Sequence, residues 1–245
     1  MTSTGLNSSV QAADIATSKA DVVVALTSYN DAGTISAVAS ALRAGSTRYL
    51  ASNAVRFVLA DAGSTDGTPE AVREVVDPIE LLEVAHEGGT TGKLAYHGYP
   101  ARAAALRAIL QTAHRLGAKA CAVVDAGLQS VEPEWIERLI APVLTDGIDY
   151  ASPYYLLSVN EGAITRSIVY PMFRALYGVR LRQPAASEFG CSGRLMAYYL
   201  EQDFWDIERA QVGIDLWLAI AAACGEFRIG EAAFEIGRAS CRERV

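Results

Sequence analysis

An apolar run that ends in an aspartate is the segment most able to do chemistry in this chain. Residues 55–61 read VRFVLAD, and a turn rich in Gly, Ser and Thr follows Asp61 at once. A carboxylate at the end of a buried strand lies where open α/β sheets bind their ligands, and Gly63 would let the backbone come close to one. An ordinary strand-to-helix connection uses the same residue types, so recurrence of the pattern decides between the two interpretations.

The pattern recurs twice. The apolar run 21–26 stops at a polar stretch that begins with Thr27, and the run 120–124 stops at Asp125. Parallel strands of one sheet bring their carboxyl ends to the same edge, so these polar groups should meet there. The groups expected at this edge are Thr27, Tyr29, Asp31, Asp61, Gly63 and Asp125.

Strands and helices are expected to alternate along the chain, which predicts an α/β fold with a mostly parallel central sheet and helices on both faces. The expected strands are residues 21–26, 55–61, 79–84, 120–124, 149–152 and 231–236. Helical patterns are expected over Ile35 to Leu42 and over residues 101–116 and 211–224. One further helix should start with Thr68 as N-cap and Pro69 as its first residue, and another should follow Pro133. The pattern loosens over residues 162–177, where an amphipathic helix ending at Tyr177 is one alternative for the segment that carries Arg166.

Composition limits the class of protein. The chain has 245 residues, of which 51% are hydrophobic and 20% charged, as in globular domains. A formal net charge of −7 argues against a nucleic-acid partner. The four cysteines are far apart, so a disulfide framework is not expected, and Cys121 and Cys224 should be buried thiols of a cytoplasmic protein. No apolar run is long enough to span a membrane.

The domain organisation is predicted as follows. Residues 1–19 lack the features of a signal peptide and are expected to form a flexible leader. Residues 20–236 should form a single domain, with a nucleotide-binding half at 20–130 and an acceptor half at 131–236 that is truncated. The basic segment 237–245 breaks the apolar pattern and is interpreted as a non-native tail.

Over about residues 20–235, the ordered motifs resemble those of family 2 type glycosyltransferases with a GT-A fold. The motifs are Thr27 to Asp31, Asp61 to Thr68, Gly92-Lys93, and Asp125 to Gln129 with Pro133 to Trp135. The resemblance implies that the first two strand ends, with Thr27, Tyr29, Asp31, Asp61 and Gly63, hold a nucleotide-sugar. It further implies that Lys93 approaches the donor phosphates and that Asp125 binds a divalent metal, Mg²⁺ or Mn²⁺.

Later segments are similar to those of glucosyl-3-phosphoglycerate synthases and their mannosylglycerate-forming relatives. This second resemblance implies that Gly162, Thr165 and Arg166 bind a glyceric-acid acceptor and that Asp215 lies near the reacting sugar. Two departures from the family pattern stand out. Gly127 occupies the second acidic position of the Asp-x-Asp motif, and Ala186 and Ser187 replace glycines before Glu188.

Sugar transfer from a nucleoside diphosphate needs groups that stabilise the departing diphosphate, which a metal and a lysine do electrostatically. In enzymes that retain the anomeric configuration, the leaving phosphate can take the acceptor proton. In an inverting enzyme a carboxylate would have to act as base, and Asp215 or Glu188 is then the candidate catalytic residue.

Three functions are consistent with the sequence. The first is a glycosyltransferase that moves a sugar to a small acceptor such as glycerate or 3-phosphoglycerate with retention of configuration. A homodimer is one arrangement expected for such an enzyme. The second is an inverting polyprenyl-phosphate sugar transferase, suggested by residues 125–129; a basic amphipathic interfacial helix would favour it, and the sequence pattern does not reveal one. The third is a nucleotide-binding protein without catalysis, suggested by Gly127.

Overall fold

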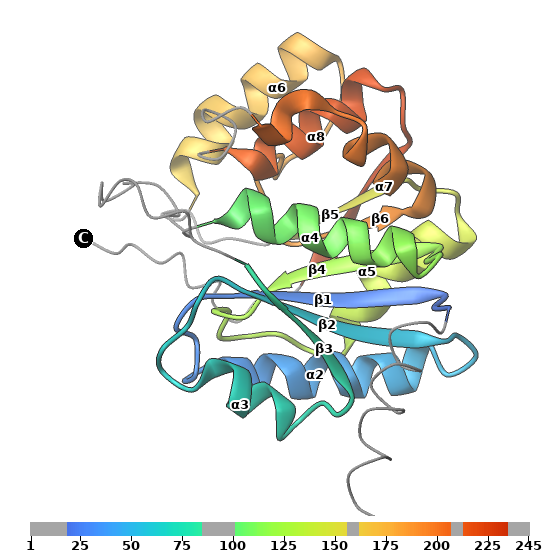
Figure 1. Cartoon of the computed structure of the whole chain (residues 1–245). Helices are drawn as coiled ribbons and strands as arrows, with labels where there is room; N and C mark the ends of the chain where they lie inside the picture. The colour runs from blue at the N-terminus through green and yellow to red at the C-terminus, as the bar shows by residue number, and fades with distance from the viewer. Residues whose placement is uncertain (1–18, 85–100, 156–161, 207–212, 235–245) are drawn as a thin grey trace, which may run out of the picture.

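The computed structural model describes residues 19–84, 101–155, 162–206 and 213–234 (Figure 1). Strands and helices alternate through most of these ranges. In chain order they are β1 (Val22–Ser28), α2 (Ile35–Tyr49), β2 (Val55–Asp61), α3 (Thr68–Arg73), β3 (Ile79–Glu83), α4 (Arg102–Arg115), β4 (Ala120–Asp125), α5 (Glu134–Thr145), β5 (Tyr150–Tyr155), η1 (Thr165–Val169), α6 (Tyr170–Tyr177), β6 (Phe189–Ser192), α7 (Gly193–Leu200), η2 (Asp203–Asp206), α8 (Ile214–Cys224) and β7 (Ile229–Phe234).

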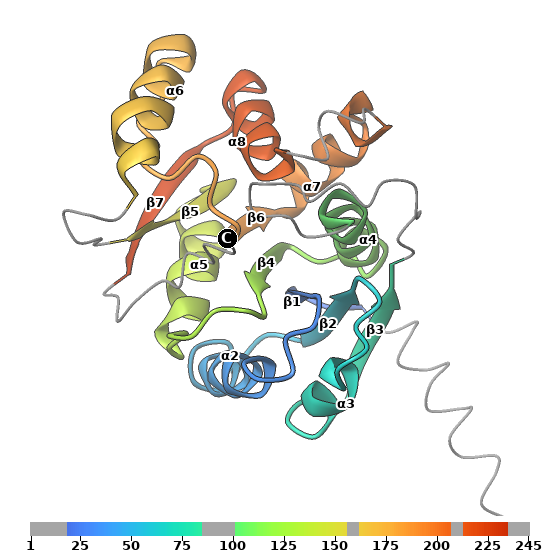
Figure 2. The same ribbon diagram turned by 90° about the vertical axis from the view of Figure 1, so that its left-hand side faces the viewer.

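Seven strands form one sheet in the order β3-β2-β1-β4-β6-β5-β7. Neighbouring strands are parallel, except that β6 runs antiparallel to both β4 and β5. The register sets Ser28 beside Asp61 and Thr27 beside Asp125. The polar ends of β1, β2 and β4 therefore meet at one edge of the sheet, as the sequence predicts (Figure 2).

Helices cover both faces of this sheet (Figures 1 and 2). α2, α3 and α5 lie against one face, while α4, α6, α7 and α8 lie against the other. Alternate residues of β1 pack on opposite faces of the sheet. Val22, Val24 and Leu26 belong to the core beneath α2, α3 and α5, and Val23 and Ala25 belong to the core beneath the other four helices. The predicted α/β class, with a mostly parallel sheet covered on both faces, is confirmed.

Local details differ from the predictions. β6 was not expected, because four residues are too few to show an alternating pattern. α3 begins at Thr68 itself, and Gly67 in the left-handed region is the N-cap, so the prediction of Thr68 as N-cap is wrong by one residue. The hydroxyl of Thr68 instead accepts a hydrogen bond from the Asp31 amide at 2.8 Å.

Cys224 is exposed, contrary to the prediction, because it is the last residue of α8 and follows the turns that face the core. Cys121 is buried in β4 as expected. Within the described ranges, no helix has both the length and the apolar character that crossing a membrane would require. The predicted tail lies outside the described residues, as does the leader except for Lys19, and the division into two halves stays a prediction.

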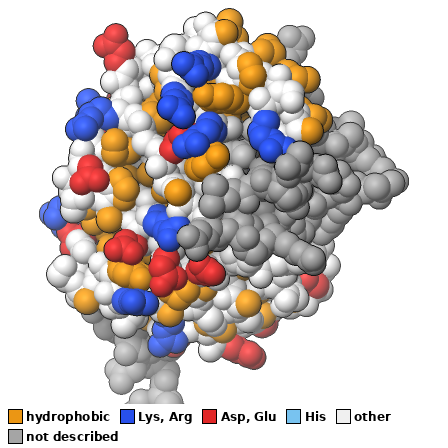
Figure 3. Space-filling model, turned by 180° about the vertical axis from the view of Figure 1, so that it is seen from behind, with side chains coloured by type: hydrophobic (Ala, Val, Ile, Leu, Met, Phe, Trp, Pro, Cys, Tyr) orange, Lys and Arg blue, Asp and Glu red, His pale blue; other side chains and the backbone are white. Residues whose placement is uncertain are grey.

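A row of hydrophobic side chains stays exposed on the helix that comprises η1, α6 and the turn before them. Ile164, Ile168, Met172 and Leu176 recur at every fourth residue, and their exposed fractions are 54%, 53%, 55% and 69%. We call these four residues the apolar stripe. Figure 3 shows hydrophobic side chains gathered over the upper part of the molecule, where Figure 1 places α6.

The close approach of α5 to β6 depends on a glycine. A Cβ atom at Gly190 would lie 2.1 Å from the backbone oxygen of Leu139, whereas nothing lies within 4 Å of a Cβ at Gly33. We expect Gly190→Ala to lower the free energy of unfolding by about 1–3 kcal/mol, because α5 must move off the sheet. Urea unfolding measures this, with Gly33→Ala as the matched control. Equal stability of the two variants would contradict the prediction.

Candidate functional site

The loops that follow β1 and β2 are hydrogen-bonded to each other at the carboxyl edge of the sheet. The amide of Asn30 donates to the Ser64 hydroxyl at 2.8 Å, and the amide of Thr65 donates to the Asn30 side-chain oxygen at 2.9 Å. Asp66 accepts from the Ala32 amide at 3.0 Å. These crossed contacts fix the backbone of both loops, which is the preorganisation that a ligand-binding edge requires.

Asp61 holds its own loop together. One carboxylate oxygen accepts from the hydroxyls of Ser28 and Ser64, each at 2.6 Å, and the other accepts from the amides of Gly63 at 3.1 Å and Ser64 at 2.8 Å. The residue is almost fully buried. Asp61 therefore shapes the loop, and its predicted contact with a nucleotide would require one of these hydroxyls to turn away.

A buried arginine lies at the centre of a second group of residues. Arg102, the first residue of α4, donates to the Thr27 hydroxyl at 2.6 Å and to the Ser187 carbonyl oxygen at 2.6 Å. Its guanidinium also forms an ion pair with Asp215 at 2.9 Å. Arg102 thus joins the end of β1, the segment before β6 and the start of α8.

The surroundings of Arg102 keep it charged. Burial acts to lower the pKa of the guanidinium, but the negative charges of Asp215, Asp125 and Glu188 outweigh it and raise that pKa above its ordinary value. A cation in the first turn of a helix is disfavoured by the helix dipole. The carboxylates must therefore hold Arg102 in place, and we call Arg102, Asp125, Glu188 and Asp215 the Arg102 cluster.

Glu188 is the most perturbed carboxyl group of the cluster. One of its oxygens accepts a short hydrogen bond from the Tyr155 hydroxyl, while the other is buried and has no partner in the described part of the chain. Burial raises the pKa of Glu188 to about 7, and the charges of Asp125 and Asp215 act in the same direction. A carboxyl group that changes its charge near neutral pH is a candidate for holding or moving a proton.

A second buried polar atom near the cluster also has no partner in the described ranges, the hydroxyl of Tyr150. Burial, with a further effect from the Asp215 charge, raises the pKa of this hydroxyl, so it stays neutral and can donate a hydrogen bond. Buried polar atoms are paired in most proteins, and exceptions are common at sites that bind ligands. Tyr150 and Glu188 therefore add a donor and an acceptor to the candidate site.

Asp125, the predicted metal ligand, ends β4 beside Thr27 and accepts a hydrogen bond from the Gly127 amide at 2.7 Å. The described residues contain no group of three acidic, histidine or cysteine side chains that could hold a metal ion. Asp125 fits the way in which Mg²⁺ often binds, through one or two carboxylates together with phosphates of the substrate. Asp125 is therefore one carboxylate that could contribute to a metal site.

The other predicted site residues are placed separately. Gly162 precedes the η1 helix with a positive φ of 65°, and Thr165 and Arg166 are its first two residues. The predicted phosphate contact Lys93 lies outside the described residues. The structure thus brings Thr27, Asp125, Glu188 and Asp215 together. It places Asp61 at the end of β2, and Asp31 and Gly63 in the adjoining loops.

Arg102, Tyr150 and Tyr155 are the residues that sequence reasoning missed. Their contacts join segments about 30 to 110 positions apart, which a local pattern cannot reveal. The one available signal is the charge of Arg102 in the first helical turn, where a cation needs a compensating partner.

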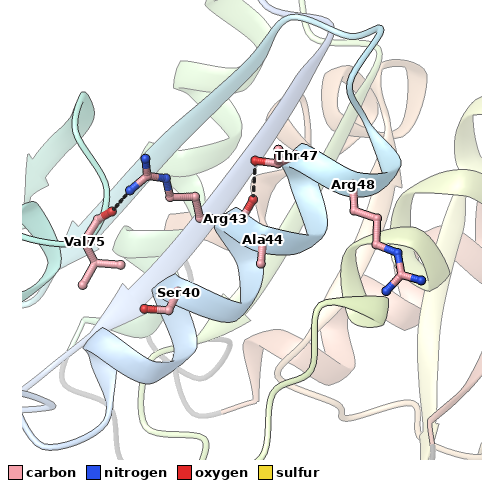
Figure 4. A pocket seen from close by; sticks show the side chains of 6 residues that line it. All are labelled: Ser40, Arg43, Ala44, Thr47, Arg48 and Val75. Carbon is pink, nitrogen blue, oxygen red and sulfur yellow. Dashed lines mark hydrogen bonds between the residues drawn. The ribbon is translucent and has the colours of Figure 1, made fainter.

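A surface depression on the outer side of α2 is separate from this site (Figure 4). It is lined by Ser40, Arg43, Ala44, Thr47, Arg48 and Val75. The Arg43 side chain donates a hydrogen bond of 2.6 Å to the Val75 carbonyl oxygen. None of the predicted site residues lines this depression, so we do not assign it to the reaction.

Comparison with family models found no match, and comparison with curated proteins found none either. The fold is similar to solved structures of glucosyl-3-phosphoglycerate synthase from Mycobacterium tuberculosis. The complex of that enzyme with Mg²⁺ and uridine diphosphate matches with a TM-score of 0.63 and 19% identity, over 91% of this chain and 73% of that chain. A complex with Mn²⁺, uridine diphosphate and glucosyl-3-phosphoglycerate matches with a TM-score of 0.62 and 17% identity, over 96% and 76%. At these identities the likeness establishes the fold, and the expected GT-A type fold is confirmed.

We predict that the Arg102–Asp215 pair is energetically coupled. Arg102→Met should lower the free energy of unfolding by about 3–5 kcal/mol, because it leaves Asp215 beside other carboxylates without its cation. The double variant with Asp215→Leu should lose less than the sum of the single losses. The control is Arg115→Met at the other end of α4, whose exposed ion pair with Glu80 should contribute about 1 kcal/mol or less. Strict additivity would show that the pair is not coupled.

The raised pKa of Glu188 predicts a pH dependence of stability. The folded protein binds this proton more tightly than the unfolded chain, so stability is lost as the pH rises from about 4.5 towards 7. Glu188→Gln removes the proton equilibrium. The free energy of unfolding of the variant, relative to that of the parent, should therefore rise by about 3 kcal/mol between these two pH values and should not change further above them.

Urea unfolding at a series of pH values between about 4 and 8 measures this difference. The exposed Glu201→Gln is the control for the removal of one carboxylate from the surface. A pH-independent difference between Glu188→Gln and the parent would contradict the assignment.

Proposed function

We propose that the protein is a glycosyltransferase that moves a sugar from a nucleoside-diphosphate-sugar to a small acceptor such as glycerate or 3-phosphoglycerate, with retention of configuration. One observation carries the proposal. The two crossed loops and the Arg102 cluster adjoin at the carboxyl edge of a GT-A type sheet. One of the similar synthase structures is a complex with Mg²⁺ and uridine diphosphate, and another is a complex with Mn²⁺, uridine diphosphate and phosphoglyceric acid.

The loops after β1 and β2 would bind the nucleotide. Their backbone is fixed by the contacts of Asp61 and Asp66, so little ordering is needed when the ligand enters. Tyr29 and Gly63 supply an aromatic ring and an exposed backbone for base and ribose. Asp31 is buried and accepts a hydrogen bond from the Tyr29 amide at 3.0 Å, so it would support the same loop. In this proposal Asp61 acts mainly by shaping the loop that presents these groups.

The Arg102 cluster would face the diphosphate and the sugar. Arg102 provides a fixed positive charge close to the ends of β1 and β4, and Lys93 is proposed as a second cation. We propose a divalent metal, Mg²⁺ or Mn²⁺, at Asp125 together with the donor phosphates. When bound, such an ion stabilises the negative charge of the departing diphosphate.

Glu188 and Asp215 would have different roles. Asp215 is held by Arg102, so it orients that cation and presents a fixed carboxylate to the sugar. Glu188 carries a proton for part of the time near neutral pH and can donate or accept at its unpartnered oxygen. If transfer inverts the configuration, Glu188 is the better base of the two, because its oxygen is not engaged by a cation.

The acceptor would lie at the start of η1. Gly162, Thr165 and Arg166 offer a backbone amide, a hydroxyl and a guanidinium, which suit a carboxylate or phosphate group. The predicted homodimer and the predicted cytoplasmic location both stay predictions.

A second candidate function is a sugar transferase that acts on a polyprenyl phosphate. The exposed apolar stripe favours it, because such an enzyme would use an amphipathic helix at the membrane surface. A nucleotide-binding protein without catalysis is the third candidate, supported by the lack of a second carboxylate at Gly127.

Nucleotide binding is the first test. Thermal unfolding should be measured with UDP, GDP and ADP, each with and without Mg²⁺ or Mn²⁺. A nucleotide at about 100 times its dissociation constant should add about 2.7 kcal/mol of stability. Asp125→Asn should remove the additional effect of the metal, while the exposed Asp146→Asn should keep it. No stabilisation by any nucleotide would refute all three candidate functions.

The identity of the acceptor is then tested by measuring the release of UDP from UDP-glucose and of GDP from GDP-mannose in the presence of each acceptor. We expect turnover with glycerate or 3-phosphoglycerate and none with a polyprenyl phosphate. The opposite result would select the lipid-phosphate function, and binding without turnover on any acceptor would select the third.

A further inference from the structure

The apolar stripe covers one side of a helix that the rest of the protein scarcely buries. From residue 163 to residue 177, Phe173 is the one fully buried side chain, and it anchors the helix to the core beside Tyr177. Ile164, Ile168, Met172 and Leu176 are each more than half exposed. Four large aliphatic side chains at regular spacing are unusual on a surface unless something covers them.

The charge around the stripe is one-sided. Residues 162–187 contain four arginines and no acidic residue, although the whole chain carries a net charge of −7. Arg182 forms an ion pair with Glu231 at 2.9 Å, so the other three arginines supply the exposed positive charge. Arg174 and Arg180 are exposed, and Arg166 is exposed at the start of the helix. Figure 3 shows Lys or Arg side chains among the hydrophobic ones over the upper part of the molecule.

The helix therefore has the composition of an interfacial helix, with aliphatic side chains on one side and arginines as its only charges. Trp217, 40% exposed, belongs to α8, which contacts α6. Tryptophan is enriched where proteins meet the headgroup region of a bilayer. An exposed tryptophan thus lies on the helix that contacts α6.

The charge pattern also distinguishes between possible partners. Two copies of this chain that met through the stripe would bring several arginines from each copy together, which opposes pairing. An anionic lipid surface would attract the arginines and repel the acidic remainder of the chain, so that only this face could approach. Charge complementarity thus favours a membrane surface over a second copy.

We propose that the helix at residues 163–177 docks the protein on the surface of an anionic lipid bilayer, with the apolar stripe among the headgroups and acyl chains. This docking does not depend on the proposed glycosyl transfer. The helix would lie in the plane of the membrane surface.

Vesicle flotation of the full chain tests the proposal. Vesicles of phosphatidylcholine with about 30% phosphatidylserine should bind the protein at about 0.1 M salt, while pure phosphatidylcholine should bind it at least about tenfold more weakly. Met172→Glu and Leu176→Glu should each lower binding by about tenfold or more, because each puts a carboxylate where the proposal places an aliphatic side chain in the bilayer. Ser40→Glu, on the exposed side of α2, adds the same charge elsewhere and should change binding little.

Other results would overturn the proposal. One is no binding to the anionic vesicles, and another is binding that both stripe substitutions leave unchanged. A third such result would come from light scattering after gel filtration. If the parent is a dimer and Leu176→Glu is a monomer, the stripe is the contact between two copies of the chain. Because both substituted residues are exposed, circular dichroism and the melting temperature should be unchanged in every variant, which separates lost docking from lost folding.

Discussion

The burial of one guanidinium among carboxylates is the interaction on which the candidate site depends. Arg102 links four separate segments: its own helix, the end of β1 at Thr27, the carbonyl of Ser187 and the start of α8 at Asp215. A buried charge without partners costs several kcal/mol, so these segments must come together when α4 packs on the sheet. The arrangement of the cluster is thus a consequence of folding and does not need a ligand to form.

The sheet topology makes this convergence possible. β1, β2 and β4 run parallel, so Thr27, Asp61 and Asp125 reach the same edge. β6 runs in the opposite direction between β4 and β5, so the segment before it also starts from that edge and brings Glu188 to the cluster. α5 lies very close to β6, which Gly190 permits. A packing constraint on one face of the sheet therefore supports a chemical group at its edge.

Sequence patterns predict the parts of this structure that are governed by local periodicity. Strands ending at Asp61 and Asp125 and the helices between them follow from apolar spacing, because each buries one face. β6 has too few residues to show such a pattern, and Cys224 occupies an end position that spacing alone did not place correctly. Arg102 could not be found, since its partners Thr27 and Asp215 are distant in the chain and only the fold makes them neighbours.

The charge balance of the cluster bears on how it could receive a diphosphate. Arg102 is its one cation, while Asp125, Glu188 and Asp215 are acidic and together outweigh burial in setting the pKa of that arginine. A diphosphate would add negative charge to a site where acidic groups already outnumber the cation. Partial protonation of Glu188 near neutral pH reduces the repulsion but does not reverse it. Binding of a nucleoside diphosphate here therefore requires further positive charge, which Lys93 or a divalent ion at Asp125 could supply. Because position 127 is a glycine and not a second carboxylate, less positive charge is required than in a site with a complete Asp-x-Asp motif.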